Sequence, residues 1–177
     1  MIMSDHLRTE EILPDILNGQ VEMLLVSAAV TPASEAAGHY FSGKRSSLYH
    51  ILYTSGLTSR RLNPEQDRQL LHHGIGVTTL CKTRAVENPE ELEPIDYAIG
   101  SIIRKVFECR PEVVCFLGLT VFSQFFDRTG DYGLQREQVS GVPVFVVPDI
   151  GNVNETNGEA VLPHYRELQA FLDSNQS

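Results

Sequence analysis

The sequence lacks the cysteine pattern, the long apolar runs and the secretion signal that define several common classes of protein. Its three cysteines, Cys81, Cys109 and Cys115, form no CxxC pair and are too few for a structural zinc or four-cysteine iron–sulfur site. The longest apolar runs, such as 23–26 and 144–147, are far shorter than the roughly 20 residues of a membrane-spanning helix. The first residues carry acids where a secretion signal has basic residues and an apolar core. We therefore expect a cytoplasmic protein with reduced thiols and no membrane contact.

Common motifs of nucleotide-binding and hydrolytic sites are also absent. The chain has no GxGxxG, GxxxxGK[ST], GxSxG or HExxH sequence, so the usual dinucleotide, P-loop, serine-hydrolase and zinc-protease signatures are excluded. His72 and His73 are adjacent, and adjacent residues on a helix point about 100° apart, which rarely suits a shared metal. We expect no metal site.

The charge of the chain is unevenly distributed. Its 177 residues carry a net charge of −9, which by itself argues against a polyanionic partner. Residues 38–84, however, contain seven basic and two acidic residues, so this segment is basic and the rest strongly acidic. The basic residues are Lys44, Arg45, Arg60, Arg61, Arg68, Lys82 and Arg84. The asymmetry fits a protein that meets a polyanion with one face, and it fits a fluctuation among solvated charges equally well.

Short apolar runs alternate with amphipathic segments, which is typical of an α/β domain. Apolar runs predict buried strands at 21–27, 75–80, 113–117 and 144–147. Helical spacing and capping residues predict helices at 46–55, 63–74, 95–110, 120–128 and around 165–172, with loops at 31–38 and 88–94. Such strands indicate a parallel sheet covered on both faces. We expect one domain over residues 1–177, with a three-layer α/β/α fold and a mostly parallel sheet of four to five strands.

The functional site is expected where the strands end. Ligands of open α/β sheets bind outside the carboxyl ends of the strands. In this sequence those ends correspond to segments 28–41, 81–84, 118–120 and 148–155.

Several short motifs follow one another in these segments. An apolar strand and loop lead to Gly-His-Tyr-Phe at 38–41, followed by Ser-Gly-Lys-Arg at 42–45 before a helix. Ser-Gly-Leu-Thr at 55–58 and Gly-Ile-Gly-Val-Thr-Thr-Leu at 74–80 come next, and then the strands at 111–118 and 144–148. In order and spacing these motifs resemble those of the mismatch-specific uracil/thymine DNA glycosylases, a family of the uracil-DNA glycosylase superfamily. The resemblance spans about residues 12–172, nearly the whole chain.

This resemblance implies an enzyme that hydrolyses the N-glycosidic bond of uracil or of another mismatched or damaged base in DNA. The nucleotide is extruded first, because the reacting bond cannot be reached inside the base stack. The implied partner is double-stranded DNA containing uracil or a mismatched base. No metal or organic cofactor is implied, and we expect a monomer.

The sequence departs from the family at the positions that activate water. The family has Gly-Ile-Asn-Pro-Gly after its first strand, where the Asn holds the attacking water, and Ala29 stands at that position here. An acid used by some members follows Gly-x-Thr in the second strand, and that position is Thr79. Since alanine cannot orient water and threonine is not a base at neutral pH, both positions are vacant.

The second family motif is Asn-Pro-Ser-Gly, followed by a leucine wedge and often a basic residue. Here Asp149 replaces the Asn and is the candidate catalytic residue, since a carboxylate beside an extruded base can act as a general base. An Asp after a strand-ending proline is also commonly a turn or helix cap. Asn152, Val153 and Asn154 are expected to contact DNA, whereas Glu155 replaces the cation and weakens phosphate binding.

The family's recognition residues have counterparts in this chain. Phe41 matches the aromatic on which the extruded base stacks, and an ordinary core phenylalanine is the alternative. His39 and Ser27 are candidates to line the base pocket, although a loop histidine is often incidental. Lys44 and Arg45 are expected to contact phosphate together with helix N-terminal amides, or else to be a solvated pair.

Three kinds of function remain open at this point. The first is an active DNA glycosylase that uses Asp149, and the second is a catalytically inactive relative that binds DNA or a nucleotide-like ligand. The vacant positions and the overall acidity favour the second. The third is an enzyme acting on free nucleosides or another small ligand, which needs no basic groove. Salt-sensitive duplex binding separates the first two from the third, and base release separates the first from the second.

Overall fold

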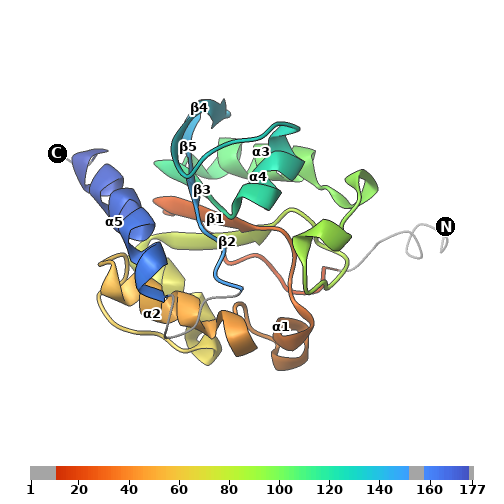
Figure 1. The fold of residues 1–177 in the computed structure, drawn as a ribbon, viewed down its shortest axis with the longest axis horizontal. Coiled ribbons are helices and arrows are strands. Elements are labelled where there is room, and N and C mark those ends of the chain that lie inside the picture. The colour runs from red at the N-terminus through yellow and green to blue at the C-terminus, as the bar shows by residue number, and fades with distance from the viewer. Residues whose placement is uncertain (1–10, 152–157, 176–177) are drawn as a thin grey trace.

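The centre of the fold is a five-stranded sheet. The computed structural model describes residues 11–151 and 158–175. The strands are β1 (Met23–Ser27), β2 (Ile75–Thr79), β3 (Val113–Leu117), β4 (Gly133–Val139) and β5 (Val142–Val147), in the order β2-β1-β3-β5-β4 (Figure 1). The pairs β1–β2, β1–β3 and β3–β5 are parallel, and β4 pairs with β5 in the antiparallel direction. The carboxyl ends of β1, β2, β3 and β5 therefore meet at one edge of the sheet.

The apolar strand runs arise because both faces of the sheet are covered. Side chains of successive strand residues point to opposite faces. Met23 and Leu25 belong to one buried apolar cluster, whereas Leu24 and Val26 belong to another. All four are almost fully shielded from solvent. Every position of β1 up to Val26 thus requires an apolar residue, which is why the strand could be predicted.

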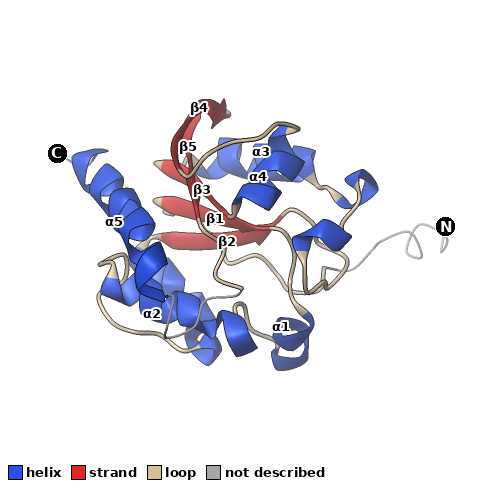
Figure 2. Cartoon of the chain, in the orientation of Figure 1, coloured by secondary structure: helices blue, strands red, loops and turns tan. Residues whose placement is uncertain are grey.

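Helices form the two outer layers. They are α1 (Pro32–Ala37), α2 (Ser47–Thr54), α3 (Ile99–Cys109), α4 (Leu119–Phe126) and α5 (Gly158–Asn175), with 3₁₀ segments at Gly43–Ser46, Pro64–His73, Pro89–Glu91 and Pro94–Asp96. Helices α2 and α5 pack in the cluster that contains Met23, and α3 and α4 pack in the other (Figure 2). The expected three-layer α/β/α fold with a mostly parallel sheet is confirmed.

The segment 31–38, expected to be a loop, contains α1 instead. The Thr31 hydroxyl accepts a hydrogen bond from the Ser34 amide at 3.3 Å, and Pro32 occupies the start of the helix. Gly38 ends it with a φ of 75°, a left-handed conformation that glycine adopts without strain. The capping signals are present in the sequence, but six residues are too few to show an apolar period.

Three other elements differ from the prediction. Helix α3 begins at Ile99 because Ile95 lies in the 3₁₀ turn after Pro94 and is 91% exposed. Strand β4 has no counterpart among the predicted strands, since four of its five interior positions are polar and only its ends are buried. The segment 63–74 begins and ends as predicted, but it is a 3₁₀ helix with a kink at Gln66. None of the described helices is long and apolar enough to span a membrane.

Candidate functional site

A cleft lies at the carboxyl ends of β1, β3 and β5. Its outer cavity has a volume of about 380 Å³, and its walls include Glu87 and Tyr132. Its inner pocket has a volume of only about 20 Å³, and its walls include Phe41. Arg45 and Asp149 line both, so the outer cavity and the inner pocket adjoin at these two side chains. The cleft occupies the edge at which ligands of parallel sheets bind.

An ion pair crosses the cleft where its two parts adjoin. Arg45, from the 3₁₀ turn before α2, donates a hydrogen bond from Nη1 to Oδ1 of Asp149 at 2.7 Å. The side chains of Arg45 and Asp149 are 17% and 31% exposed. Within the described residues, no protein donor bonds the other carboxylate oxygen. Asp149 is therefore held by a cation at one oxygen, while none of the described residues donates to the other.

Two neighbouring elements fix the position of Asp149. The hydroxyl of Tyr165 on α5 donates to the carbonyl of Pro148 at 2.9 Å, and burial raises the pKa of this tyrosine, so it remains a donor. Gly118, at the end of β3, has a φ of 112°, and a Cβ there would lie 3.1 Å from Cβ of Asp149. Glycine thus makes room for the aspartate and adopts a backbone conformation that other residues avoid.

Phe41 forms a wall of the inner pocket and adopts an unusual backbone conformation. Its φ is 56°, and the residue is 6% exposed. Its ring lies 6.0 Å from that of Tyr40 and 6.2 Å from that of Tyr49. Two hydrogen bonds hold the flanking residues, from the Tyr49 hydroxyl to the Tyr40 carbonyl at 2.6 Å and from the Ser42 amide to Ser34 Oγ at 3.0 Å. The surrounding structure thus imposes a conformation that costs a bulky residue free energy.

Ser27 and Ala29 both line the inner pocket, but Thr79 does not. Ser27 ends β1 and places a hydroxyl-bearing residue beside Phe41, whereas the Ala29 methyl group offers no hydrogen bond. Thr79 is 1% exposed, and its hydroxyl donates to the carbonyl of Cys81 at 2.7 Å. The threonine is therefore a structural residue of β2 and takes no part in the pocket.

His39 lies away from the inner pocket, although only Tyr40 separates it from Phe41. Its Nδ1 is 3.3 Å from Oδ1 of Asp67, whose other oxygen accepts the Tyr40 amide at 2.9 Å. These residues line a separate cavity of about 310 Å³ beside Pro14. His39 thus lines a different cavity from Phe41, and its role in base binding stays a prediction.

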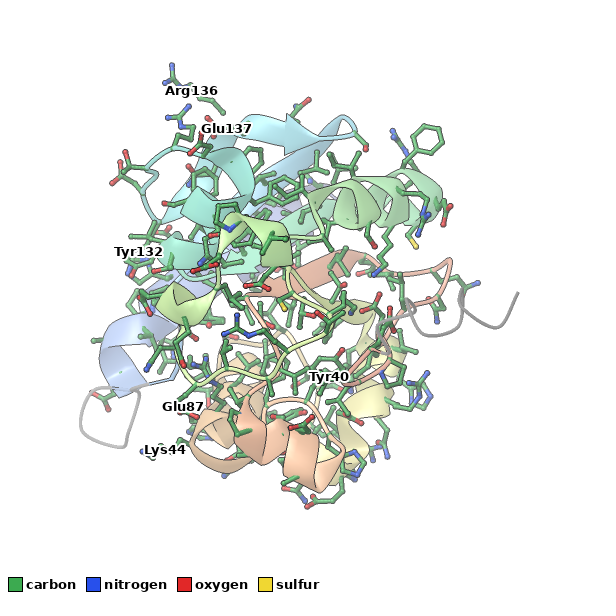
Figure 3. All side chains as sticks on the ribbon, turned by 90° about the vertical axis from the view of Figure 1, so that its right-hand side faces the viewer. Tyr40, Lys44, Glu87, Tyr132, Arg136 and Glu137 are labelled. Carbon is green, nitrogen blue, oxygen red and sulfur yellow. The ribbon has the colours of Figure 1, made fainter. Side chains whose placement is uncertain are left out.

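The residues expected to bind DNA lie in different surroundings. Lys44 is exposed, and Figure 3 shows it along the same edge of the molecule as Glu87 and Tyr132. Arg45 points into the cleft and pairs with Asp149. Asn152, Val153 and Asn154 lie outside the described residues. Among residues 11–151 and 158–175, no group of three His, Cys, Asp or Glu side chains could hold a metal ion.

Some contributors to the site have no signal in the sequence. Arg45 and Asp149 are 104 positions apart, and no local pattern pairs them. Glu87 and Tyr132 lie in connecting segments. Only the three-dimensional course of the chain places them at the outer cavity. The strand-end rule nevertheless identified Gly118 and Asp149 as neighbours of the site.

Comparison with known protein families places most of the chain in a family. A family model described as the uracil DNA glycosylase superfamily matches residues 14–172. The match covers almost all of the described chain, including each strand and both residues of the ion pair.

Proposed function

The chain belongs to the uracil DNA glycosylase superfamily, and we propose that it hydrolyses the N-glycosidic bond of uracil or of another mismatched or damaged base extruded from duplex DNA. Membership of the superfamily supports a DNA glycosylase-like function and a DNA partner. The finer assignment to the mismatch-specific uracil/thymine branch rests on the motifs at 38–45 and 74–80. The observation that carries the proposal is that Phe41 and Asp149 line one pocket at the carboxyl edge of the sheet.

In this proposal Asp149 performs the role of the water-holding asparagine, whose own position is occupied by Ala29. A water molecule attacks C1′ of the sugar and gives its proton to the carboxylate, while the bond between C1′ and the base nitrogen breaks and its electron pair leaves with the base. The carboxylate also stabilises the positive charge that develops on the sugar. The inner pocket, at about 20 Å³, has room for a single water molecule.

The extruded base stacks on the ring of Phe41 in the same account. The ring is rigid because Tyr40 and Tyr49 pack against it, so little entropy is lost when a base binds. Ser27 lines the same pocket and offers a hydroxyl to a polar edge of the base. Lys44, exposed beside the cleft, is a candidate for contact with a flanking phosphate.

A second candidate function is a relative that binds DNA or a nucleotide-like ligand without cleaving it. Two observations favour it. The inner pocket presents the methyl group of Ala29 where the family has its water-holding side chain, and Thr79 is bonded to the backbone. Glu87 and Glu90 line the outer cavity with Asp149, which makes the approach to the cleft acidic and weakens phosphate binding.

The two functions are separated by base release and duplex binding measured together. Labelled duplexes containing uracil, a thymine mismatch, hypoxanthine or ethenocytosine are incubated with the protein at low salt, where phosphate contacts are strongest. Release of any of these bases supports the glycosylase. Salt-sensitive binding without release supports the inactive relative, and the absence of both would contradict the glycosylase and a relative that binds DNA.

A further inference from the structure

The guanidinium of Arg45 stands between the outer cavity and the inner pocket. It lines both, as does its partner Asp149, and the two spaces differ greatly in size, about 380 Å³ against about 20 Å³. The inner pocket as it stands has room for a water molecule but not for a nucleobase. A base that enters to stack on Phe41 must therefore move the residues around this pocket first.

Arg45 is tightly held in this position but incompletely satisfied. Its Nη1 is bonded to Asp149 at 2.7 Å, and its Nη2 reaches the carbonyl of Glu87 at 3.3 Å. On the other side the guanidinium is so close to Gly151 that a Cβ there would lie 2.7 Å from Nη2. The Nε atom is buried and has no hydrogen-bond partner among the described residues. A buried donor without a partner is costly. Arg45 would therefore be stabilised in a position where Nε makes a hydrogen bond.

We propose that Arg45 determines which ligands enter the inner pocket, as a plug that a DNA phosphate withdraws. Phosphate is a strong competitor for a guanidinium because it can accept two parallel N–H bonds. A phosphodiester that draws Arg45 towards exposed Lys44 opens the inner pocket and at the same time releases Asp149 from its cation. Free bases and nucleosides, which carry no phosphate, leave the plug in place. The plug thus selects against free bases and nucleosides and in favour of bases carried on a phosphodiester chain, and this part of the inference rests on the proposed function.

The plug can be tested without DNA through a thiol placed in the inner pocket. Ser27→Cys differs from the natural residue in one atom and lines the pocket behind Arg45. Its alkylation by neutral iodoacetamide is followed by peptide mass mapping, which separates it from the partly exposed Cys109. Combining it with Arg45→Ala should raise the alkylation rate by about tenfold or more, because the pocket no longer needs a local opening. Arg104→Ala, which removes a cation at an exposed position of α3, is the control and should leave the rate unchanged.

A second variant keeps the test informative if Arg45→Ala perturbs the fold. Asp149→Ala leaves the arginine intact but removes its anchor, so it too should accelerate alkylation of the thiol. Melting temperatures of all variants identify any that unfold. Equal alkylation rates in the presence and absence of Arg45, with both proteins folded, would overturn the proposal.

Protection experiments then test the selection of ligands. Excess free uracil should slow alkylation only in the Arg45→Ala background, whereas a duplex with non-cleavable 2′-fluoro-2′-deoxyuridine opposite guanine should slow it in the protein that retains Arg45. Protection of the arginine-containing protein by free uracil would overturn the plug. If the duplex fails to protect while Arg45→Ala still accelerates alkylation, the DNA substrate is wrong and the proposal of phosphate-linked substrates falls, but the plug stands.

Discussion

Nη1 of Arg45 lies 2.7 Å from Oδ1 of Asp149, which joins the turn before α2 to the end of β5 across the mouth of the inner pocket. The ion pair links the proposed roles of the two residues. In the proposed function Asp149, at the position of the asparagine in the second family motif, is the catalytic carboxylate, and Arg45 is the cation that pairs with it. In the proposed function, the ion pair must therefore separate when a base enters the inner pocket.

The ring of Phe41 should contribute to binding through its flat face. Phe41→Leu keeps an apolar side chain but removes the ring, so affinity for a duplex with a non-cleavable extruded base should fall by about tenfold to a hundredfold. The dissociation constant is measured by fluorescence anisotropy at low salt. Phe125→Leu is the control, because Phe125 is similarly buried but packs in the opposite layer. Equal affinities of the two variants would mean that Phe41 is only a core residue.

Restoring the family's residue at Ala29 should increase activity. Ala29 lines the inner pocket with Asp149, so an asparagine there can bond a water molecule near the carboxylate. Ala29→Asn should raise the rate of base release by about tenfold or more, since orienting the attacking water is a large part of this catalysis. Single-turnover kinetics measure the rate, with Ala36→Asn on the exposed face of α1 as control. A rate that stays constant or falls in a folded Ala29→Asn protein would count against a water site beside Asp149.

Asp67 should stabilise the turn that carries Phe41. It is 5% exposed, accepts the Tyr40 amide and contacts His39. Asp67→Ala leaves the buried amide without a partner and should lower the free energy of unfolding by about 1–3 kcal/mol. Urea denaturation measures this, and Asp67→Asn, which keeps one acceptor, should lose less. Glu65→Ala, at an exposed position, is the control; an equal loss in Glu65→Ala and Asp67→Ala would exclude a specific role.

The ion pairs of Asp15 should make the protein sensitive to acid. Burial alone would raise the pKa of this carboxyl, but Lys82 and Lys105 bond it and bring the pKa below its ordinary value of 3.8. Because the folded state binds this proton more weakly than the unfolded state, the stabilisation is complete above the ordinary pKa and is lost as pH falls through the lowered one.

Asp15→Asn tests this contribution to stability. The variant should be less stable at neutral pH and should show a smaller loss of stability between about pH 5 and pH 2. The measurement is the free energy of unfolding as a function of pH. Asp173→Asn on α5, away from these lysines, should follow the unmodified protein. If Asp15→Asn loses as much stability on acidification as the unmodified protein, the acid sensitivity comes from other groups.

Much of the fold could be predicted from the sequence because buried parallel strands need apolar residues at consecutive positions. This holds for β1, β3 and β5, and less strictly for β2, in which Thr78 and Thr79 are buried. It fails for β4, an edge strand in which polar residues are tolerated, and for α1, whose six residues reveal only its caps.

The site could be predicted only in part, for a different physical reason. The strand-end rule depends on topology alone, and the segments that it selects include Gly118 and Asp149, which both line the outer cavity. The direction of His39 depends on the local backbone conformation, which a residue pattern does not reveal. His39 lines the cavity beside Pro14, whereas Phe41, with its positive φ, lines the inner pocket. The partner of Asp149 depends on contacts between distant segments, and nothing near Arg45 in the sequence indicates them.

The most direct test of the central claim is the single-turnover rate of base release by the unmodified protein, Asp149→Asn and Asp173→Asn, on the duplex that the unmodified protein cleaves best. Asparagine keeps the shape of the side chain but cannot take the proton of water, so Asp149→Asn should reduce the rate by about a hundredfold or more. Asp173→Asn should leave it unchanged. Base release that continues undiminished in a folded Asp149→Asn protein would contradict the assignment of Asp149 as the base.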